Sequence, residues 1–230
     1  IFNGSKYYIL QHGSLHSNHI IKENTNEYKV CDKFFYWGNK YKNKKGVKAF
    51  NFKLIRNNYR KKKFKILVIC KGRGFENETY DRSYEHKIIF DNFKKFINLI
   101  PKKILNNIYF RVKDNLKINI EKEFLTSKNL NIVNSSVNIF DLINNSSLVI
   151  YLYNSTGIYE NLTLNIPTMF YWADSKNYRN SQNNDFMKFC KKNKIFYESI
   201  DNIAQELILK YDFIDSWWRN NKLQRQRELI

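Results

Sequence analysis

The chain has 230 residues, of which 43% are hydrophobic and 17% aromatic, so it can bury a substantial core. It contains no run of about eighteen or more apolar residues and no charged-then-apolar amino terminus, which argues against a membrane-spanning helix and against export. We therefore predict a cytoplasmic protein. Because the chain starts at Ile1, without a methionine and close to a strand-like segment, we expect it to be the later part of a longer protein.

The formal net charge is +19 and the pI is near 9.7, values that ordinarily indicate nucleic acid as a partner. The excess of lysine runs through the whole sequence, together with many Asn, Ile, Tyr and Phe residues. Such a uniform bias indicates mutational drift of the composition and not a single basic face that binds phosphate. Residues 60–63 form the densest basic run, where a solvated turn is the ordinary explanation. We disfavour nucleic acid and keep a basic nucleic-acid-binding module as the alternative from another class. Attraction of basic segments to an anionic membrane surface stays open as a further interaction.

The cysteines and histidines predict neither a disulfide framework nor a metal site. Cys31, Cys70 and Cys190 lie far apart and are odd in number, so we predict reduced thiols in or near the core. Three of the four histidines fall within residues 12–19, with no cysteine at metal-ligand spacing.

Short apolar runs bounded by polar turns predict eight strands, at residues 6–10, 31–37, 64–70, 107–112, 131–133, 148–153, 168–172 and 195–197. Helical spacing and capping signals predict helices at residues 84–99, 139–144, from about 157, at 200–211 and from 215 onward. Residues 40–48 are predicted as a basic connection, residues 50–55 as a short strand or linker, and residues 118–124 are ambiguous.

Strands that alternate with helices favour an α/β domain, a Rossmann-like parallel sheet with helices on both faces. In such sheets ligands bind beyond the carboxyl ends of the strands. Four loops are expected at such ends, namely residues 11–14, 71–74, 113–115 and 154–157. We expect them to converge.

The most informative stretch is LVIYLYNSTGIYENLTLNIPTMFYW, residues 148–172, because it begins with an apolar run typical of a strand buried on both faces. Asn154, Ser155 and Thr156 then supply N-cap oxygens for a helix. Gly157 would let a ligand approach the backbone, and the amides that open a helix favour an anion. The plain alternative is that Ser155 and Thr156 only cap the helix.

Further polar residues are predicted to contact a nucleotide. Glu160 lies about one turn into the same helix, where it could accept hydrogen bonds from ribose hydroxyls or merely favour the helix dipole. Lys71 and Arg73 flank Gly72 after a strand and could neutralise phosphates, as could Arg111 at another strand end, although each could also be a solvated cation. The loop that contains Gly72 lacks the third glycine of a dinucleotide fingerprint, which argues against NAD.

His12 is the first candidate for proton transfer. It follows a predicted strand and precedes Gly13, and an unperturbed pKa of about 6.5 suits a general base near neutral pH. The structural alternative is a histidine that is hydrogen-bonded to the backbone in a rigid loop. His16 is the second candidate.

Four segments together carry a resemblance to a known family. They are YYILQHGSLHSN, DKFFYWGNKY, YNSTGIYENLTLNIPTMFYW and the adjacent tryptophans of DSWWRN, and the third is the most specific. With these segments the chain resembles the LIC12162 family of bacterial surface-carbohydrate transferases over most of its length. One departure is that VKD follows Arg111, where a more acidic or proline-bearing segment is expected. Of Trp217 and Trp218, we expect at most one to face the core, with packing as the favoured role.

The resemblance implies the GT-B fold, in which two Rossmann-like domains face each other across a cleft. It also implies distant similarity to capsule Kdo transferases and to teichoic-acid glycerophosphotransferases. On this basis the chain is the carboxyl-terminal half of a GT-B-type glycosyltransferase. Residues 1–55 then end the amino-terminal acceptor-side domain and its linker, residues 56–214 form the nucleotide-sugar-binding domain, and residues 215–230 form a carboxyl-terminal helix.

The implied activity is transfer of a sugar from a nucleotide-activated donor, preferably a CMP-activated ulosonic acid, to a cell-surface polysaccharide or its lipid-linked precursor. The donor is a substrate, and no cofactor or metal is implied, because a helix N-terminus and cations can carry the charge of the leaving phosphate. A lipid-linked acceptor implies peripheral contact with the inner face of the cell membrane. Transfer of a polyol phosphate from a CDP-activated donor is the neighbouring alternative, and a non-catalytic assembly subunit is a third.

Overall fold

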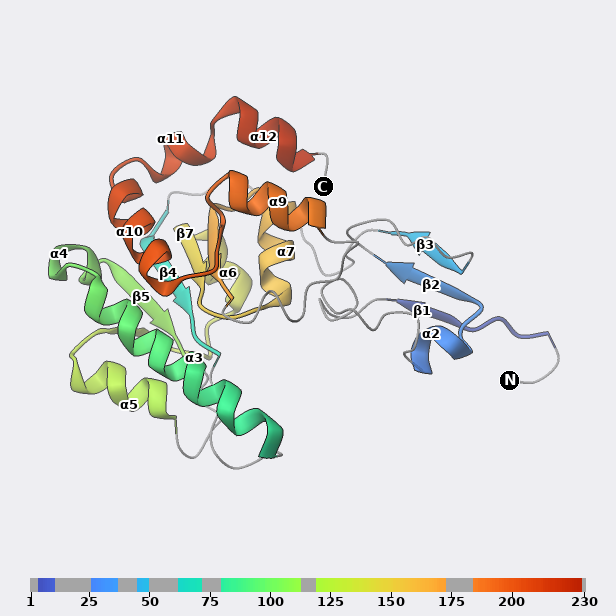
Figure 1. Ribbon diagram of the computed structural model, residues 1–230, viewed down its shortest axis with the longest axis horizontal. Coiled ribbons are helices and arrows are strands. Elements are labelled where there is room, and N and C mark those ends of the chain that lie inside the picture. Colours follow the sequence, from blue (N-terminus) through green and yellow to red (C-terminus); the bar gives the residue numbers. More distant parts are fainter. Residues whose placement is uncertain are drawn as a thin grey trace.

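The computed structural model describes residues 4–10, 26–36, 45–49, 62–71, 80–112, 119–172 and 184–228. The described residues form two parallel sheets, one of three strands toward the amino terminus and one of six strands (Figure 1). None of the helices within these ranges combines the length and the apolar character needed to cross a membrane.

The small sheet has the order β1 (Tyr8–Leu10), β2 (Lys33–Tyr36), β3 (Gly46–Lys48), and helix α2 (Asn26–Val30) accompanies it. Its own core consists of Tyr28, Cys31, Phe34 and Tyr36, with Ile9 packed against them. The prediction of a basic connection over residues 40–48 was wrong for the last three residues. Gly46–Lys48 form a strand because they pair with β2, and no local sequence pattern indicates this pairing.

The six strands of the large sheet all run parallel: β4 (Phe64–Ile69), β5 (Ile108–Arg111), β6 (Asn131–Val133), β7 (Ser146–Tyr151), β8 (Thr168–Tyr171) and β9 (Phe196–Tyr197). Their spatial order is β6-β5-β4-β7-β8-β9. The chain therefore builds outward from β4 in one direction and then from β7 in the other, which is the doubly wound Rossmann-like order.

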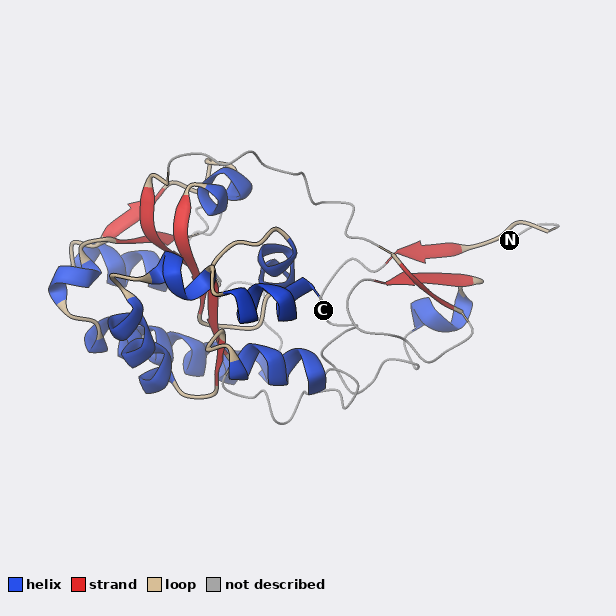
Figure 2. Cartoon of the chain, turned by 90° about the horizontal axis from the view of Figure 1, so that it is seen from above, coloured by secondary structure: helices blue, strands red, loops and turns tan. Residues whose placement is uncertain are grey.

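Helices cover both faces of the large sheet, as Figure 2 shows from above. The side chains of β4 alternate between two cores, Ile66 and Val68 on one face and Leu67 and Ile69 on the other. The first core includes residues of α3 (Tyr80–Leu99), α4 (Lys102–Leu105), α5 (Ile120–Ser127) and α10 (Ile200–Lys210). The second includes residues of α6 (Ile139–Asn144), α7 (Thr156–Thr163), α9 (Asn184–Lys192) and α12 (Asn221–Glu228), while α11 (Ile214–Trp218) contributes to both. This confirms the predicted fold class.

Several predicted boundaries were wrong for identifiable reasons. The tail from residue 215 is two helices and not one, because the Asn220 side chain accepts hydrogen bonds from the Lys222 and Leu223 amides and starts α12 afresh. Within the ambiguous stretch 118–124, residues 120–124 open helix α5, which Asn119 caps. Helices α2, α4 and α9 were not predicted, since they are short or rich in polar residues. The predicted strand or linker at residues 50–55 lies outside the described residues.

All three cysteines are free and buried, which confirms the prediction of core thiols. The two sheets are joined in sequence through residues 50–61, which lie outside the described residues, so the boundary after residue 55 stays a prediction. Helices α11 and α12 pack on the large domain, where Trp218 and Leu223 are each 3% exposed.

Candidate anion-binding site

The chain reverses its winding direction between β4 and β7, which are neighbours at the centre of the large sheet. Ligands of doubly wound sheets bind beyond the carboxyl ends of the strands at this switch point. The register makes three strand ends level, because Ile69 of β4 pairs with Arg111 of β5 on one side and with Tyr151 of β7 on the other. Lys71, Arg111 and residues 154–157 therefore leave the sheet at one common edge.

Helix α7 begins at this edge, and Ser155 is its N-cap. The Ser155 hydroxyl oxygen accepts a hydrogen bond from the Gly157 amide at 3.2 Å, and its carbonyl oxygen accepts one from the Ile158 amide at 3.2 Å. The capping role of Ser155 is thus confirmed, and these two amides of the helix start already have acceptors within the chain. Residues 153–157 and Glu160 are half-buried, so the helix end is open to solvent.

Packing beneath helix α7 explains why residue 157 is a glycine. A Cβ at this position would lie 2.4 Å from the Tyr151 hydroxyl oxygen, much closer than real Cβ contacts. Tyr151 is 1% exposed, and its hydroxyl accepts a hydrogen bond from Asn161 Nδ2 at 3.4 Å. The glycine therefore admits the Tyr151 hydroxyl under the first turn of α7, a reason that differs from the predicted approach of a ligand.

Arg111 is a half-buried residue at the switch-point edge. Its Nε is buried without a hydrogen-bond partner, and no carboxylate pairs with its guanidinium among the residues that the structure describes. Burial raises the pKa values of Tyr151 and Tyr153, and the charge of Arg111 opposes that rise for both. The guanidinium therefore lies near the two phenols, one of which supports α7.

The structure brings part of the predicted site together. Lys71, Arg111 and residues 154–157 share the edge described above. Glu160 lies near Tyr151: burial raises the pKa of the Tyr151 phenol most, Tyr153 raises it next, and the charge of Glu160 raises it further. The remaining predicted residues, His12, His16, Gly72 and Arg73, lie outside the described residues. Within the described ranges no three His, Cys, Asp or Glu side chains gather as a metal site would require.

A family model described as "LIC12162 family transferase" matches residues 1–230. The chain belongs to this transferase family. No match to a curated protein was found. Among solved structures, the chain is similar to the spinosyn rhamnosyltransferase SpnG complexed with thymidine diphosphate, with 10% sequence identity and a TM-score of 0.44. The match covers 87% of this chain and 52% of that one, so the chain spans about half the length of SpnG.

In this LIC12162 family transferase, sequence analysis missed a buried carboxylate near the same edge. Glu121 is the second residue of α5 and is 6% exposed. Burial raises the pKa of Cys70, the residue that follows β4, and the charge of Glu121 raises it further. Asn119 as an N-cap, followed by acidic residues in the first turn, is a sequence signal for helix α5 and so for the position of Glu121. The sequence analysis did not use this signal, because it left residues 118–124 unassigned.

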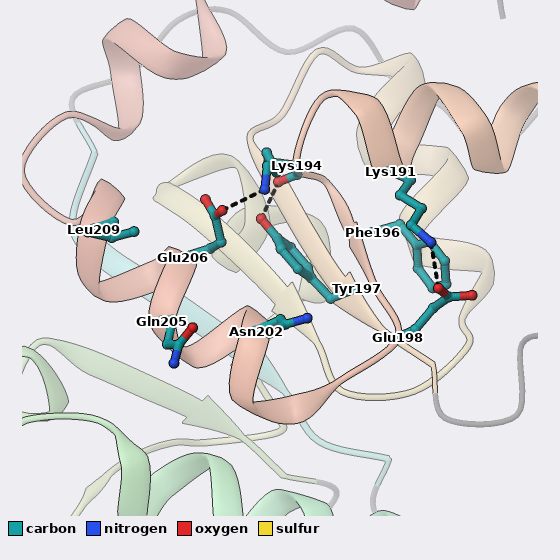
Figure 3. A pocket seen from close by; sticks show the side chains of 9 residues that line it. All are labelled: Lys191, Lys194, Phe196, Tyr197, Glu198, Asn202, Gln205, Glu206 and Leu209. Atoms are coloured by element: carbon teal, nitrogen blue, oxygen red, sulfur yellow. Dashed lines mark hydrogen bonds and ion pairs between the residues drawn. The ribbon is translucent and has the colours of Figure 1, made fainter.

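Two hollows lined by described residues lie away from the switch point. One, of about 380 Å³, lies between β9 and α10 (Figure 3), and its charges pair with one another. Lys191 Nζ lies 2.6 Å from Glu198 Oε2, and Lys194 Nζ lies 2.9 Å from Glu206 Oε1. The other, of about 470 Å³, is an apolar groove beside α6 whose lining includes Phe64, Tyr109 and Val133.

Proposed function

We propose that this transferase is a glycosyltransferase that holds the phosphate of a nucleotide-activated sugar between Arg111 and the first turn of α7. The observation that carries the proposal is that the half-buried residue Arg111 has a buried Nε with no acceptor among the described residues at the switch-point edge. A buried donor without a partner costs folding free energy, so such a group is retained for a reason other than stability. Because guanidinium is a planar fork that matches phosphate oxygens, a donor phosphate supplies the missing acceptor.

The first turn of α7 supports the same assignment. Its N-terminus carries roughly half a positive charge, and an anion there gains from both the dipole and the amides. The Ser155 hydroxyl is bonded to the Gly157 amide at 3.2 Å, at the long end of the usual range. In this scheme a phosphate oxygen takes over that amide, the hydroxyls of Ser155 and Thr156 turn toward the phosphate, and Lys71 adds positive charge from the end of β4.

Glu160 is assigned to the nucleoside in this scheme. It lies in α7, half-buried, where a carboxylate can accept hydrogen bonds from ribose hydroxyls while the helix start holds the phosphate. The preferred donor is a CMP-activated ulosonic acid, a choice that rests on the family's distant similarity to capsule Kdo transferases. Transfer of a polyol phosphate from a CDP-activated donor uses the same phosphate site and is the competing assignment.

The transfer step itself needs an acceptor hydroxyl, a base and a stabilised leaving group. The acceptor oxygen bonds to the anomeric carbon, the bond from that carbon to the phosphate oxygen breaks, and the nucleotide leaves with the electron pair. His12 is the proposed base for the hydroxyl proton, with His16 as the second choice, and Arg111 with α7 stabilises the phosphate charge. The proposed acceptor is a glycan or lipid-linked precursor, and the proposed location is the cytoplasm, with peripheral contact at the inner face of the membrane.

The small sheet is proposed to belong to an acceptor-side domain. Complete parallel sheets are covered on both faces, yet β1 leaves Tyr8 53% exposed and Leu10 46% exposed. A GT-B arrangement would cover that face with further elements of the same domain and would set the small sheet across a cleft from the nucleotide.

A thermal-shift screen of the purified protein with CMP, CDP, UDP, GDP, inorganic phosphate and a short oligonucleotide tests the proposal. A ligand at about 100 times its Kd stabilises the folded state by about 2.7 kcal/mol, and a domain of this size gains about 2–4 °C in Tm per kcal/mol. We expect cytidine nucleotides to raise Tm by about 5–10 °C and inorganic phosphate to raise it less. A response to uridine or guanosine nucleotides alone overturns the cytidine assignment. A shift with an oligonucleotide and none with any mononucleotide favours the nucleic-acid-binding alternative instead.

A further inference from the structure

The carboxyl-terminal end of α7 is held by side chains from far along the chain. The last carbonyls of a helix have no partner within the helix, and α7 is followed by Asn165 in the left-handed conformation, with φ of 59°. Trp218 Nε1 donates to the Asn165 carbonyl oxygen at 3.1 Å and to Asn165 Oδ1 at 2.8 Å. Arg227 Nη1 donates to the Leu162 carbonyl oxygen at 3.1 Å. Residues of α11 and α12 thus cap the helix that opens at the candidate anion site.

These donors are themselves fixed in place. Gln224 Nε2 donates to the Trp218 carbonyl oxygen at 2.7 Å, and Arg227 Nε donates to Gln224 Oε1 at 3.2 Å. Trp218 is 3% exposed, so its indole cannot turn away without opening the core. We call Trp218, Gln224 and Arg227 the C-terminal clasp.

Helix α7 is therefore supported at both ends. Under its first turn, the Tyr151 hydroxyl fills the space beside Gly157, and beyond its last turn the clasp holds Leu162 and Asn165. With eight residues the helix is about 12 Å long and behaves as a short rigid rod. A shift at the clasped end is therefore transmitted to Ser155, and displacements of about 1 Å are enough to weaken binding and catalysis.

We propose that the C-terminal clasp positions α7 for donor binding, with Trp218 and Arg227 as positioning residues that act through the helix. The inference rests on the proposed function, because it concerns the same phosphate site. It also gives the adjacent tryptophans of DSWWRN two separate roles, which the sequence could not distinguish.

Trp217 provides a matched control within the same motif. Its Nε1 donates to the Asn193 carbonyl oxygen at 3.2 Å, and Asn193 lies just beyond α9 and not beyond α7. In Figure 1, α12 lies beside α9, and the bond from Asn193 Nδ2 to Gln226 Oε1 at 3.0 Å joins these two regions. Replacing either tryptophan by phenylalanine removes one indole donor and keeps an aromatic ring.

The experiment compares Trp218→Phe, Arg227→Gln and Trp217→Phe by calorimetric titration with CMP and by hydrogen exchange of the α7 amides. We expect Trp218→Phe to weaken CMP binding about three- to tenfold and to speed exchange in the last turns of α7, with a smaller change for Arg227→Gln. Trp217→Phe should leave CMP affinity within about twofold and loosen α9 instead.

Equal weakening by the two tryptophan variants overturns the inference, because it indicates a general loss of stability. Unchanged α7 exchange in Trp218→Phe overturns it as well. If the wild-type protein binds no CMP, the proposed donor fails, and faster α7 exchange confined to Trp218→Phe and Arg227→Gln still supports the positioning of α7 by the clasp.

Discussion

Two charged regions of the large domain differ in how their charges are satisfied. In the hollow between β9 and α10, Lys194 pairs with Glu206 and Lys191 pairs with Glu198 (Figure 3). Glu206 also pairs with Lys210. At the switch-point edge, Arg111 is half-buried, and no carboxylate among the described residues pairs with its guanidinium.

The difference separates a structural charge cluster from a binding site. Charges that neutralise one another are satisfied within the folded chain, and their removal should change stability and not ligand affinity. A buried donor without an acceptor is a cost to the fold, and its removal should change affinity and not stability. Opposite responses of these two regions are therefore the signature of the proposed site.

The largest effect is expected from Arg111→Met. Loss of charge-assisted hydrogen bonds to a phosphate should weaken CMP binding about 10- to 100-fold. The Tm should stay level or rise, since the buried Nε without an acceptor is removed. Calorimetric titration and thermal melting of the same preparation measure both quantities. Arg111→Lys keeps the positive charge but loses the planar guanidinium, so its CMP affinity should lie between those of the wild type and Arg111→Met. If Arg111→Met instead lowers the Tm and leaves CMP affinity intact, the role of Arg111 is structural.

Gly157→Ala should have the next largest effect, through packing. The added Cβ would meet the Tyr151 hydroxyl oxygen at 2.4 Å, so Tyr151 or the first turn of α7 must shift. We expect a loss of about 1–3 kcal/mol of stability and a drop in Tm of about 3–10 °C. Adding Tyr151→Phe should restore part of the loss, because it removes the nearest atom and leaves ring carbons at 3.0 and 3.2 Å. A double variant no more stable than Gly157→Ala would show that the contact is not the cause.

Glu206→Gln should have the smallest effect, confined to stability and dependent on pH. Burial opposes ionisation of Glu206, but hydrogen bonds and charges from Lys210 and Lys194 outweigh it and lower the pKa of the carboxyl below its ordinary value of 4.5. A lowered folded-state pKa stabilises the protein above the ordinary value, and this contribution is lost as the pH falls through the folded-state pKa.

Urea unfolding of wild type and Glu206→Gln at pH 7, 5 and 4 measures this contribution. The wild type should be more stable by about 1 kcal/mol at pH 7, because the group is partly exposed and its ion pairs are screened by solvent. The difference should shrink at the lowest pH, and CMP affinity at pH 7 should be unchanged. A gap of equal size at all three values would mean that ionisation of Glu206 is not responsible.

Local signals in the sequence predicted much of the fold and the start of the site. The apolar run before residue 154, the Ser155 cap and Pro167 located β7, α7 and β8, because each acts within a few residues along the chain. Arg111 could be proposed as a ligand because it ends a strand, and strand ends of a parallel sheet share an edge.

What the sequence could not predict depends on contacts between distant segments. The role of Gly157 requires Tyr151 to pack beneath it, and the roles of the two tryptophans require α11 to meet the ends of α7 and α9. That no carboxylate in the described ranges pairs with Arg111 could not be predicted either, since an acidic residue could have paired with it in another arrangement. Such features are properties of tertiary packing, and no local pattern encodes them.

A crystal structure of the protein with CMP tests the central claim most directly. The account predicts the phosphate within hydrogen-bond distance of the Arg111 guanidinium and of the α7 start at residues 155–157. A nucleotide seated in the apolar groove beside α6, or in the hollow between β9 and α10, with the Arg111 guanidinium untouched, would contradict it.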